Sequence, residues 1–196
     1  MKNRTKIWLS AAVFLVLSGI IIIGGIMSMS GWDFSKFSTA EHETNTHEVN
    51  EEYQNFSINT KTADIEFVAS ENGKTSVVCR EEKKVKHSVT VKEGSLVIEC
   101  VDTRKWYEHI GINFQTPKIT VYIPQGEYGA LSLTSATGSI EIPKDFKFKS
   151  IDISENTGAV TNYASAEEGI KIKTTTGSIR IENISAGPLD LSVSTG

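Results

Sequence analysis

Hydrophobic residues follow two different patterns along this chain, and the first of them lies near the N-terminus. Residues 7–29 are 23 consecutive uncharged positions, most of them apolar, including four isoleucines in a row at 20–23. At 1.5 Å per residue, a helix of this length spans the roughly 30 Å hydrocarbon core of a bilayer. The pattern therefore predicts one membrane-spanning helix over residues 7–29.

A cleavable signal peptide is the alternative interpretation of this segment. Signal peptides have a shorter apolar region, of about 7–15 residues, followed by a small-x-small cleavage site. The uninterrupted apolar stretch favours a retained anchor instead. Lys2, Arg4 and Lys6 precede it, and no acidic residue occurs before residue 30. The positive-inside rule then places residues 1–6 in the cytoplasm and everything after the helix outside, in a protein that crosses the cytoplasmic membrane once.

Residues 30–52 follow the helix and show no periodic apolar face. Their glutamates are Glu41, Glu43, Glu48, Glu51 and Glu52. This composition predicts an acidic, solvated extracytoplasmic spacer that separates the following domain from the lipid surface. His42 and His47 lie among the glutamates, but a flexible tether loses too much entropy when its side chains converge on an ion. We therefore expect no metal site in the spacer.

The second hydrophobic pattern is a repeat. Thr-Gly dipeptides begin at positions 137, 157, 176 and 195, so their spacings are 20, 19 and 19 residues. Aliphatic residues lie six and four positions before each threonine, and the residues between them are polar. The aliphatic pairs are Leu131 and Leu133, Ile151 and Ile153, Ile170 and Ile172, and Leu189 and Leu191. This period-two alternation predicts strands with one buried and one solvated face.

Each repeat unit is expected to contain a strand, a glycine turn and a second strand. Stacking successive units at about 4.8 Å would bring equivalent aliphatic side chains into one continuous column. We therefore predict an all-β domain over residues 53–196, built as a parallel β-solenoid or β-roll with rungs of 19–20 residues. A sandwich of antiparallel hairpins is the alternative.

Two parts of the domain depart from the regular repeat. The template fits once more around Thr62, where Ala63 replaces the glycine. Residues 75–124 break the period and predict strands at 75–80, 87–92, 95–101 and 118–123, which we expect to cap or buttress the first rung. The last unit stops at Gly196 without a returning strand. We interpret this as a truncated chain or as a rung completed by another subunit.

The anchor, the acidic spacer and the repeat units together resemble a known family. The first rung reads Phe56-x-Ile58-x-x-x-Thr62-Ala63-x-Ile65-x-Phe67, and Ile119-x-Val121-x-Ile123-Pro124 and a train of Leu-x-Leu…Thr-Gly-x-Ile units follow. Over residues 53–196 this pattern resembles the putative-adhesin β-strand-repeat family of bacterial surface proteins (domain of unknown function 4097). The resemblance implies a parallel β-roll displayed outside a cytoplasmic membrane, and it implies no catalytic residues.

Charge and motifs narrow the functional classes. Lys and Arg number 20 and Asp and Glu 24, for a formal net charge of −4, so the basic surface typical of nucleic-acid binding is missing. No local signature of hydrolases, metal sites, dinucleotide binding or redox dithiols occurs, and we expect no cofactor, no metal and no catalytic residue. Cys79 and Cys100 are expected on the apolar faces of their strands, either bridged or as buried free thiols.

A loop between two of the predicted strands is the candidate contact site. Large aromatic side chains combined with arginine are common where proteins contact proteins or glycans. The residues concerned are Arg104, Trp106, Tyr107, His109 and Phe114. The alternative is that Trp106 and Phe114 plug the open end of the roll, which the usual burial of large apolar side chains favours.

These expectations favour a non-enzymatic, membrane-anchored module for adhesion, scaffolding or envelope sensing, with the bilayer and an unidentified protein or glycan as partners. A carbohydrate-active β-solenoid enzyme is the first alternative. Asp152 and Asp190 share one column two rungs apart, about 9.6 Å by the strand spacing, with Lys171 between them. The second alternative is an accessory subunit of a membrane sensor complex that associates through Gly24 and Gly25 of the helix.

Overall fold

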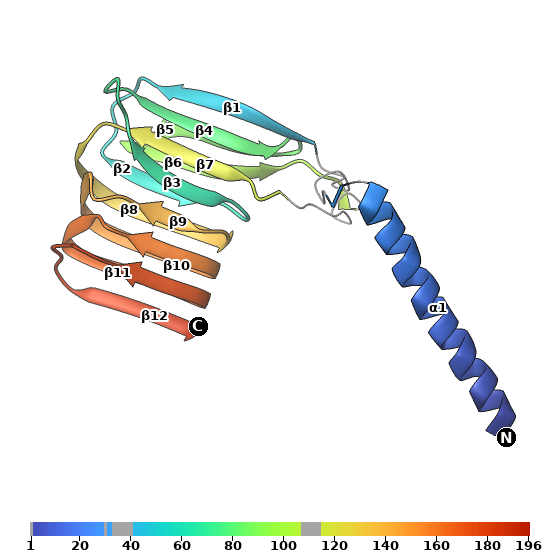
Figure 1. The fold of residues 1–196 in the computed structure, drawn as a ribbon. Coiled ribbons are helices and arrows are strands. Elements are labelled where there is room, and N and C mark those ends of the chain that lie inside the picture. The colour runs from blue at the N-terminus through green and yellow to red at the C-terminus, as the bar shows by residue number, and fades with distance from the viewer. Residues whose placement is uncertain (1, 30, 33–40, 107–114) are drawn as a thin grey trace. The chain divides into compact units, whose positions relative to one another are not determined.

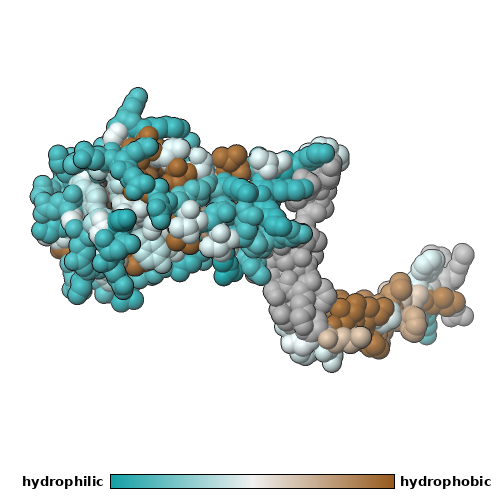
Figure 2. Space-filling model, turned by 90° about the horizontal axis from the view of Figure 1, so that it is seen from above, coloured by the Kyte–Doolittle hydropathy of each residue, from teal (hydrophilic) through white to brown (hydrophobic). Residues whose placement is uncertain are grey.

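The computed structural model describes residues 2–29, 31–32, 41–106 and 115–196, which divide into a helical unit and a β unit. The helical unit contains α1 (Lys2–Met29), whose stretch Thr5–Met29 is 25 residues long and includes an 18-residue window with a mean hydropathy of 2.5. Figure 2 shows apolar side chains along this helix, whereas polar side chains dominate the visible face of the β unit. The predicted N-terminal apolar helix is confirmed, and it is long enough to cross a membrane.

The β unit is a single sheet of 12 strands (Figure 1). In chain order they are β1 (His42–Val49), β2 (Asn55–Asn59), β3 (Asp64–Ala69), β4 (Thr75–Glu82), β5 (Val85–Lys92), β6 (Ser95–Asp102), β7 (Lys118–Ile123), β8 (Gly126–Thr137), β9 (Ile140–Ile142), β10 (Phe146–Asn162), β11 (Ser165–Ile181) and β12 (Leu189–Thr195). Their order across the sheet is β12-β11-β10-β8-β2-β6-β5-β4-β7-β3-β9, and β1 pairs with β4. The predicted all-β domain is confirmed.

Successive repeat units pair in parallel and in register. Ile153 of β10 lies opposite Leu133 of β8 on one side and Ile172 of β11 on the other, and Ile172 in turn lies opposite Leu191 of β12. The residues two positions earlier in each unit form a second column in the same way, which is buried in β8, β10 and β11. Equivalent aliphatic side chains therefore form continuous columns, and the alternative of antiparallel hairpins is wrong for these units.

The Thr-Gly corners allow the backbones of neighbouring rungs to approach closely. Gly138, Gly158 and Gly177 have φ values of +148°, +155° and +137°, a region that side chains with a Cβ rarely adopt. A Cβ on Gly158 would overlap the carbonyl oxygen of Gly138, and a Cβ on Gly177 would overlap that of Gly158. Glycine is therefore required at each corner both by its backbone conformation and by the space available.

Aromatic side chains fill the part of the core that lies away from the Thr-Gly corners. The ring of Phe56 packs edge-on against four neighbours, with centroids 5.3 Å from Tyr53, 5.8 Å from Phe67, 5.2 Å from Tyr128 and 5.9 Å from Phe148. Edge-to-face contacts of this kind contribute beyond the area they bury. The regular aliphatic ladder is thus closed at one side by an aromatic cluster drawn from three rungs.

The segment that breaks the sequence period supplies an additional rung. β6 pairs in parallel with β2, placing Leu96 opposite Phe56, and β7 pairs in parallel with β3, placing Ile119 opposite Ile65. The expectation that residues 75–124 cap or buttress the first rung is therefore corrected for the second half of this segment, because β6 and β7 continue the same columns.

The sheet also closes on itself, which differs from an open stack of rungs. β10 pairs with β8 through its first half and with β9 through its second half, so nine strands form a closed ring. The antiparallel strands β4 and β5 complete this ring, β4 along β7 and β5 along β6. β11 and β12 extend the parallel pairing beyond it. The predicted capping strands are present, and they join the sheet as members of the ring.

Part of the predicted spacer is a strand. β1 runs antiparallel to the whole of β4, from the pair His42 and Glu82 to the pair Val49 and Thr75. Its inward-facing residues include Asn45 and His47, which lie opposite Cys79 and Val77. The expectation of a fully solvated spacer is therefore corrected for residues 42–49, because an unpaired edge of β4 is available to them.

The opposite end of the sheet is exposed. All seven residues of β12 are exposed, including Leu189, Leu191 and Val193, which continue the buried columns of β11. The equivalent residues Ile170 and Ile172 one rung earlier are buried. The two ends of the sheet thus differ, one covered by antiparallel strands and one showing an apolar edge.

Candidate functional site

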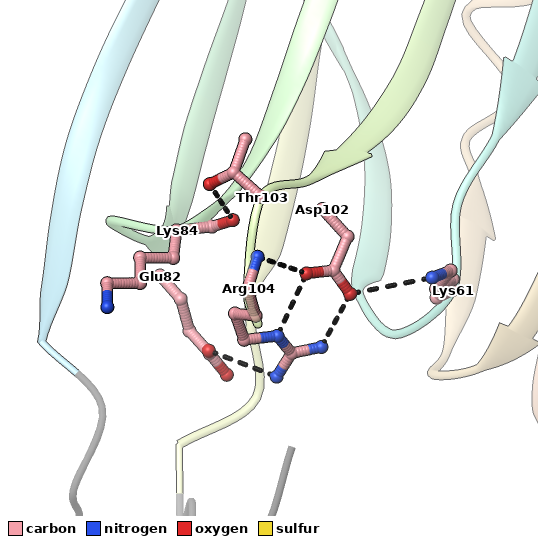
Figure 3. A network of polar contacts seen from close by, with 6 residues as sticks. All are labelled: Lys61, Glu82, Lys84, Asp102, Thr103 and Arg104. Carbon is pink, nitrogen blue, oxygen red and sulfur yellow. Dashed lines mark hydrogen bonds and ion pairs between the residues drawn. The ribbon is translucent and has the colours of Figure 1, made fainter. Parts of the chain in front are cut away.

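A polar network holds the start of the loop that contains the predicted contact residues (Figure 3). Arg104 donates from Nε to Asp102 Oδ1 at 3.0 Å and from Nη2 to Asp102 Oδ2 at 2.8 Å. The backbone N–H of Arg104 also donates to Asp102 Oδ1, at 3.1 Å. Paired contacts between a guanidinium and a carboxylate are among the strong polar interactions in proteins. The end of β6 and the first loop residues therefore form a locally rigid structure.

Other elements of the sheet extend this network. Lys61, in the corner of the first rung, lies with Nζ 3.5 Å from Asp102 Oδ2, and Arg104 Nη1 lies 3.5 Å from Glu82 Oε2. Thr103 donates both its backbone N–H and its Oγ1 to the carbonyl oxygen of Lys84, each at 2.9 Å. The start of the loop is thus fixed to two other parts of the sheet, the corner after β2 and the turn between β4 and β5.

The charges at this site stabilise each other. The Arg104 guanidinium holds the pKa of the Asp102 carboxyl well below its usual range, mainly by hydrogen bonding, and Asp102 raises the pKa of Arg104 in return. The side chains are 11% and 24% exposed, so solvent screens the pair less than a surface pair. Arg104 therefore uses much of its hydrogen-bonding capacity within the protein.

Trp106 is the predicted contact residue that faces solvent. It is 79% exposed. Tyr107, His109 and Phe114 lie outside the residues that the structure describes. The plug interpretation is therefore wrong for Trp106, whose ring does not cover the core. Its position just beyond the fixed base of the loop presents a large aromatic surface to solvent.

The β unit corresponds to a recognised family. Residues 53–196 match the family model described as Toastrack DUF4097. The chain belongs to the Toastrack DUF4097 family. This confirms the resemblance that the rung motifs carry. No curated protein matches the chain significantly.

Solved structures related to this Toastrack domain share little sequence with it. One is a putative cell adhesion protein from Clostridium sporogenes, at 10% identity over 81% of this chain and 100% of that chain, with a TM-score of 0.42. A putative adhesin from Parabacteroides distasonis has 12% identity over 80% of this chain and 71% of that chain, with a TM-score of 0.43. A putative lipid binding protein from Parabacteroides distasonis has 12% identity over 80% of each chain, with a TM-score of 0.38.

The acidic pair considered for catalysis lies on the outer face of the Toastrack domain. Strand register places Lys171 between Asp152 and Asp190, and Lys171 Nζ lies 3.3 Å from Asp152 Oδ2. These residues border an open hollow of about 310 Å³, which Glu168 also lines. Both side chains of the ion pair are about half exposed. An alternating charge ladder on the surface accounts for this arrangement.

The most unusual titratable group of the domain is inside it. Glu155 is buried, and neither carboxylate oxygen finds a hydrogen-bond partner among the described residues. Its neighbours in register are Ser135 and Thr174, which are also buried. Burial, with a smaller contribution from the charge of Asp64, raises the pKa of Glu155 to about 7. Glu155 lies two residues before the Thr-Gly corner, where the alternation would place another inward-facing side chain. A charged residue at this position could therefore have been noticed in the sequence.

The two cysteines are free thiols. Cys79 is buried in β4 and Cys100 is partly buried in β6, and β5 lies between these strands in the sheet. Of the two states that the sequence leaves open, a bridge or free thiols, the structure therefore has free thiols. Cys79 lies instead beside Glu81 and His87, a grouping that the sequence analysis did not identify.

Most of the network around Arg104 was not among the expectations from the sequence. Asp102 could have been found from its spacing, because a carboxylate two residues before an arginine at a strand end can accept from both the backbone and the guanidinium. Lys61 and Glu82 come from other strands, and no local spacing relates them to Arg104. Their contribution follows only from the pairing of the sheet.

Proposed function

We propose that this protein is a non-enzymatic, membrane-anchored module that presents its Toastrack domain outside the cytoplasm for adhesion, scaffolding or envelope sensing. One observation carries the proposal, namely that a single chain joins an apolar helix, unburied over its most apolar stretch, to a β domain whose visible face in Figure 2 is mostly polar. An unburied apolar helix is stable in lipid, whereas a charged exterior requires water. The two parts thus require different environments.

The anchor and its orientation are part of this proposal. The apolar stretch Thr5–Met29 exceeds the length of a signal-peptide core, which supports retention of the helix. Lys2, Arg4 and Lys6 support a cytoplasmic N-terminus. The Toastrack domain then lies on the outer side of a cytoplasmic membrane.

We also infer that the rungs continue as a parallel β-solenoid from β8 onward. The support is the register of β8, β10, β11 and β12, in which each Thr-Gly corner lies opposite the corner of the preceding unit. Repeat stacks of this type present long, regular outer faces, which suit a scaffold or adhesion surface.

A protein or glycan ligand would contact the domain at the loop after β6. Trp106 provides an exposed aromatic surface there, and the bidentate pair of Asp102 and Arg104 holds the base of the loop in place. Aromatic side chains on rigid supports lose little entropy on binding and often dominate contact energies. Tyr107, His109 and Phe114 remain the accompanying candidates.

Labelling of intact cells tests the orientation. Ser132 is exposed on the outer face of β8, so a membrane-impermeant maleimide should label the variant Ser132→Cys in intact cells. The variant Asn3→Cys, at the N-terminal end of the helix, is the matched control and should be labelled only after lysis. The unsubstituted chain measures any background from Cys79 and Cys100. Labelling of Asn3→Cys but not Ser132→Cys in intact cells would contradict the proposed topology.

A carbohydrate-active enzyme is the competing function, and the hollow between Asp152, Lys171 and Asp190 is the observation that favours it. Hydrolysis across a panel of glycans distinguishes the two functions. The non-enzymatic proposal expects no turnover from the purified chain. A measurable activity that is lost in Asp152→Asn would contradict the non-enzymatic proposal and support the enzyme function.

A further inference from the structure

The interior of the antiparallel end contains three side chains of the types that bind metal ions. Cys79 and Glu81 are two residues apart on β4, so both point to its buried face, and His87 lies on β5 beyond the connecting turn. All three residues are buried. One potential ligand atom from each lies within 4.8 Å of those from the other two. The hairpin thus gathers a thiol, a carboxylate and an imidazole at one point.

Two further residues orient these groups. His87 Nδ1 lies 2.8 Å from Glu81 Oε2, and His87 Nε2 lies 2.8 Å from Thr60 Oγ1. Asn45 of β1 donates from Nδ2 to Glu81 Oε1 at 2.9 Å. Histidines that bind metal through one ring nitrogen usually hydrogen-bond through the other, and ligating carboxylates are usually hydrogen-bonded as well. Thr60 and Asn45 occupy these supporting positions.

The charges that the three groups can carry match a divalent cation. A carboxylate removed from water is costly unless it is paired. A divalent cation bound to one thiolate and one carboxylate gives a cluster without net charge. The thiol proton leaves to solvent when the ion binds.

We propose that Cys79 Sγ, Glu81 Oε2 and His87 Nδ1 bind a Zn²⁺ ion. Sulfur, nitrogen and oxygen donors are all ligands of zinc, and the thiolate distinguishes the site from one for Mg²⁺ or Ca²⁺. Three protein ligands leave a fourth tetrahedral position for solvent. The ion would join β4 and β5 directly, and through Asn45 and Thr60 it would hold β1 and the first rung.

A purely hydrogen-bonded cluster makes a different prediction. His87, Glu81, Thr60 and Asn45 satisfy one another without Cys79. The thiol is therefore the group that separates the two interpretations. Cys100 provides a matched control, because it is the other cysteine of the chain, lies on β6 opposite His87, and is not a member of the cluster.

Metal content and cobalt spectroscopy of the full chain in detergent test the site. After exposure to Zn²⁺ and removal of free metal, elemental analysis should find about one zinc per chain. Co²⁺ should give thiolate-to-cobalt charge-transfer absorption in the unsubstituted protein and in Cys100→Ser, but not in Cys79→Ser. Competition with a chromophoric chelator should show that Cys79→Ser and His87→Gln weaken Zn²⁺ binding more than about 100-fold, beyond the effect expected for losing only a supporting contact.

Measurements on the unsubstituted protein keep the test independent of whether the variants fold. Absence of both stoichiometric zinc and the charge-transfer band from a natively folded chain would overturn the proposal. Equal loss of zinc in Cys100→Ser would overturn this choice of ligands. Zinc that persists unchanged in a folded Cys79→Ser would show that the ion binds elsewhere.

Discussion

The regular stack of β8 to β12 and the antiparallel end of β1, β4 and β5 fill their interiors with different kinds of side chain. In the stack, each buried side chain lies beside its own equivalent in the next rung, such as Ile153 beside Ile172. At the antiparallel end, Glu81 contacts His87 and Asn45, groups of different chemistry from different strands. A periodic interior can therefore be mostly aliphatic, whereas an end without equivalent neighbours can contain polar groups that pair specifically.

Replacing a corner glycine should break the regular stack most severely. Gly158→Ala would place a Cβ on the carbonyl oxygen of Gly138 and force a strained φ of +155° on alanine. The overlap is with backbone atoms and cannot relax through side-chain movement, so we expect a loss of at least about 3 kcal/mol. Gly126→Ala is the control, because no atom lies within 4 Å of its added Cβ. Denaturant unfolding that gives equal stability for both variants would refute the corner model.

The second prediction concerns the polar exception inside the stack. The pKa of Glu155 is raised to about 7 from 4.5, so the folded state holds a proton that the unfolded state has lost between these values. Stability should therefore fall as pH rises from about 4.5 to 7, by on the order of 3 kcal/mol in total, and this contribution should be constant above 7.

The variant Glu155→Gln isolates that contribution. It should remove this part of the pH dependence and be more stable than the unsubstituted protein above pH 7. Glu141→Gln, on the exposed face of β9, should keep the original slope. Unfolding free energies measured from pH 4 to 8 decide the matter. A parallel shift of the Glu155→Gln curve, without a change in slope, would show that folding does not raise the pKa of Glu155.

A smaller effect is expected at the base of the loop after β6. Asp102→Asn should lose about 1–2 kcal/mol at neutral pH, because it removes a partly buried bidentate pair. The pKa of Asp102 is lowered in the fold, so its stabilisation should be complete above about pH 4 and should be lost as pH falls further. A double-mutant cycle with Arg104→Gln measures the coupling.

The exposed pair Arg180 and Glu182 provides the matched control for that cycle. It has the same two-residue separation, and its atoms lie 2.7 Å apart, but its side chains are 62% and 43% exposed. Its coupling should stay below about 0.5 kcal/mol. Equal coupling in the two pairs would show that partial burial adds nothing at Asp102.

The smallest effect is expected on the outer face of the stack. Asp152→Asn removes an ion pair whose partners are about half exposed, so its unfolding free energy should change by less than about 0.5 kcal/mol. A larger loss would indicate that the charge ladder of Asp152, Lys171 and Asp190 stabilises the rungs more than the surface interpretation allows.

Much of the fold can be predicted from local sequence because its determinants are local. The apolar helix follows from uninterrupted hydrophobicity, the buried columns follow from period-two alternation, and the corners follow from Thr-Gly dipeptides at a constant spacing. The turn between β5 and β6 was also predictable, because the dipeptide Glu93-Gly94 contains a glycine of the kind that tight hairpin turns require. Both residues adopt positive φ there. The exposure of Trp106 was not, because large aromatic residues are usually buried.

The sequence by itself determined the membrane-length helix, the repeat and the family, since each depends on residues close together in the chain. Only the tertiary structure decided that β1 covers β4, that β6 and β7 form a rung, and that Cys79, Glu81 and His87 meet. Asn45 and Glu81 are 36 residues apart, and Thr60 and His87 are 27 apart. Local periodicity carries no information about which distant strands become neighbours, because the closure of the whole sheet decides that pairing.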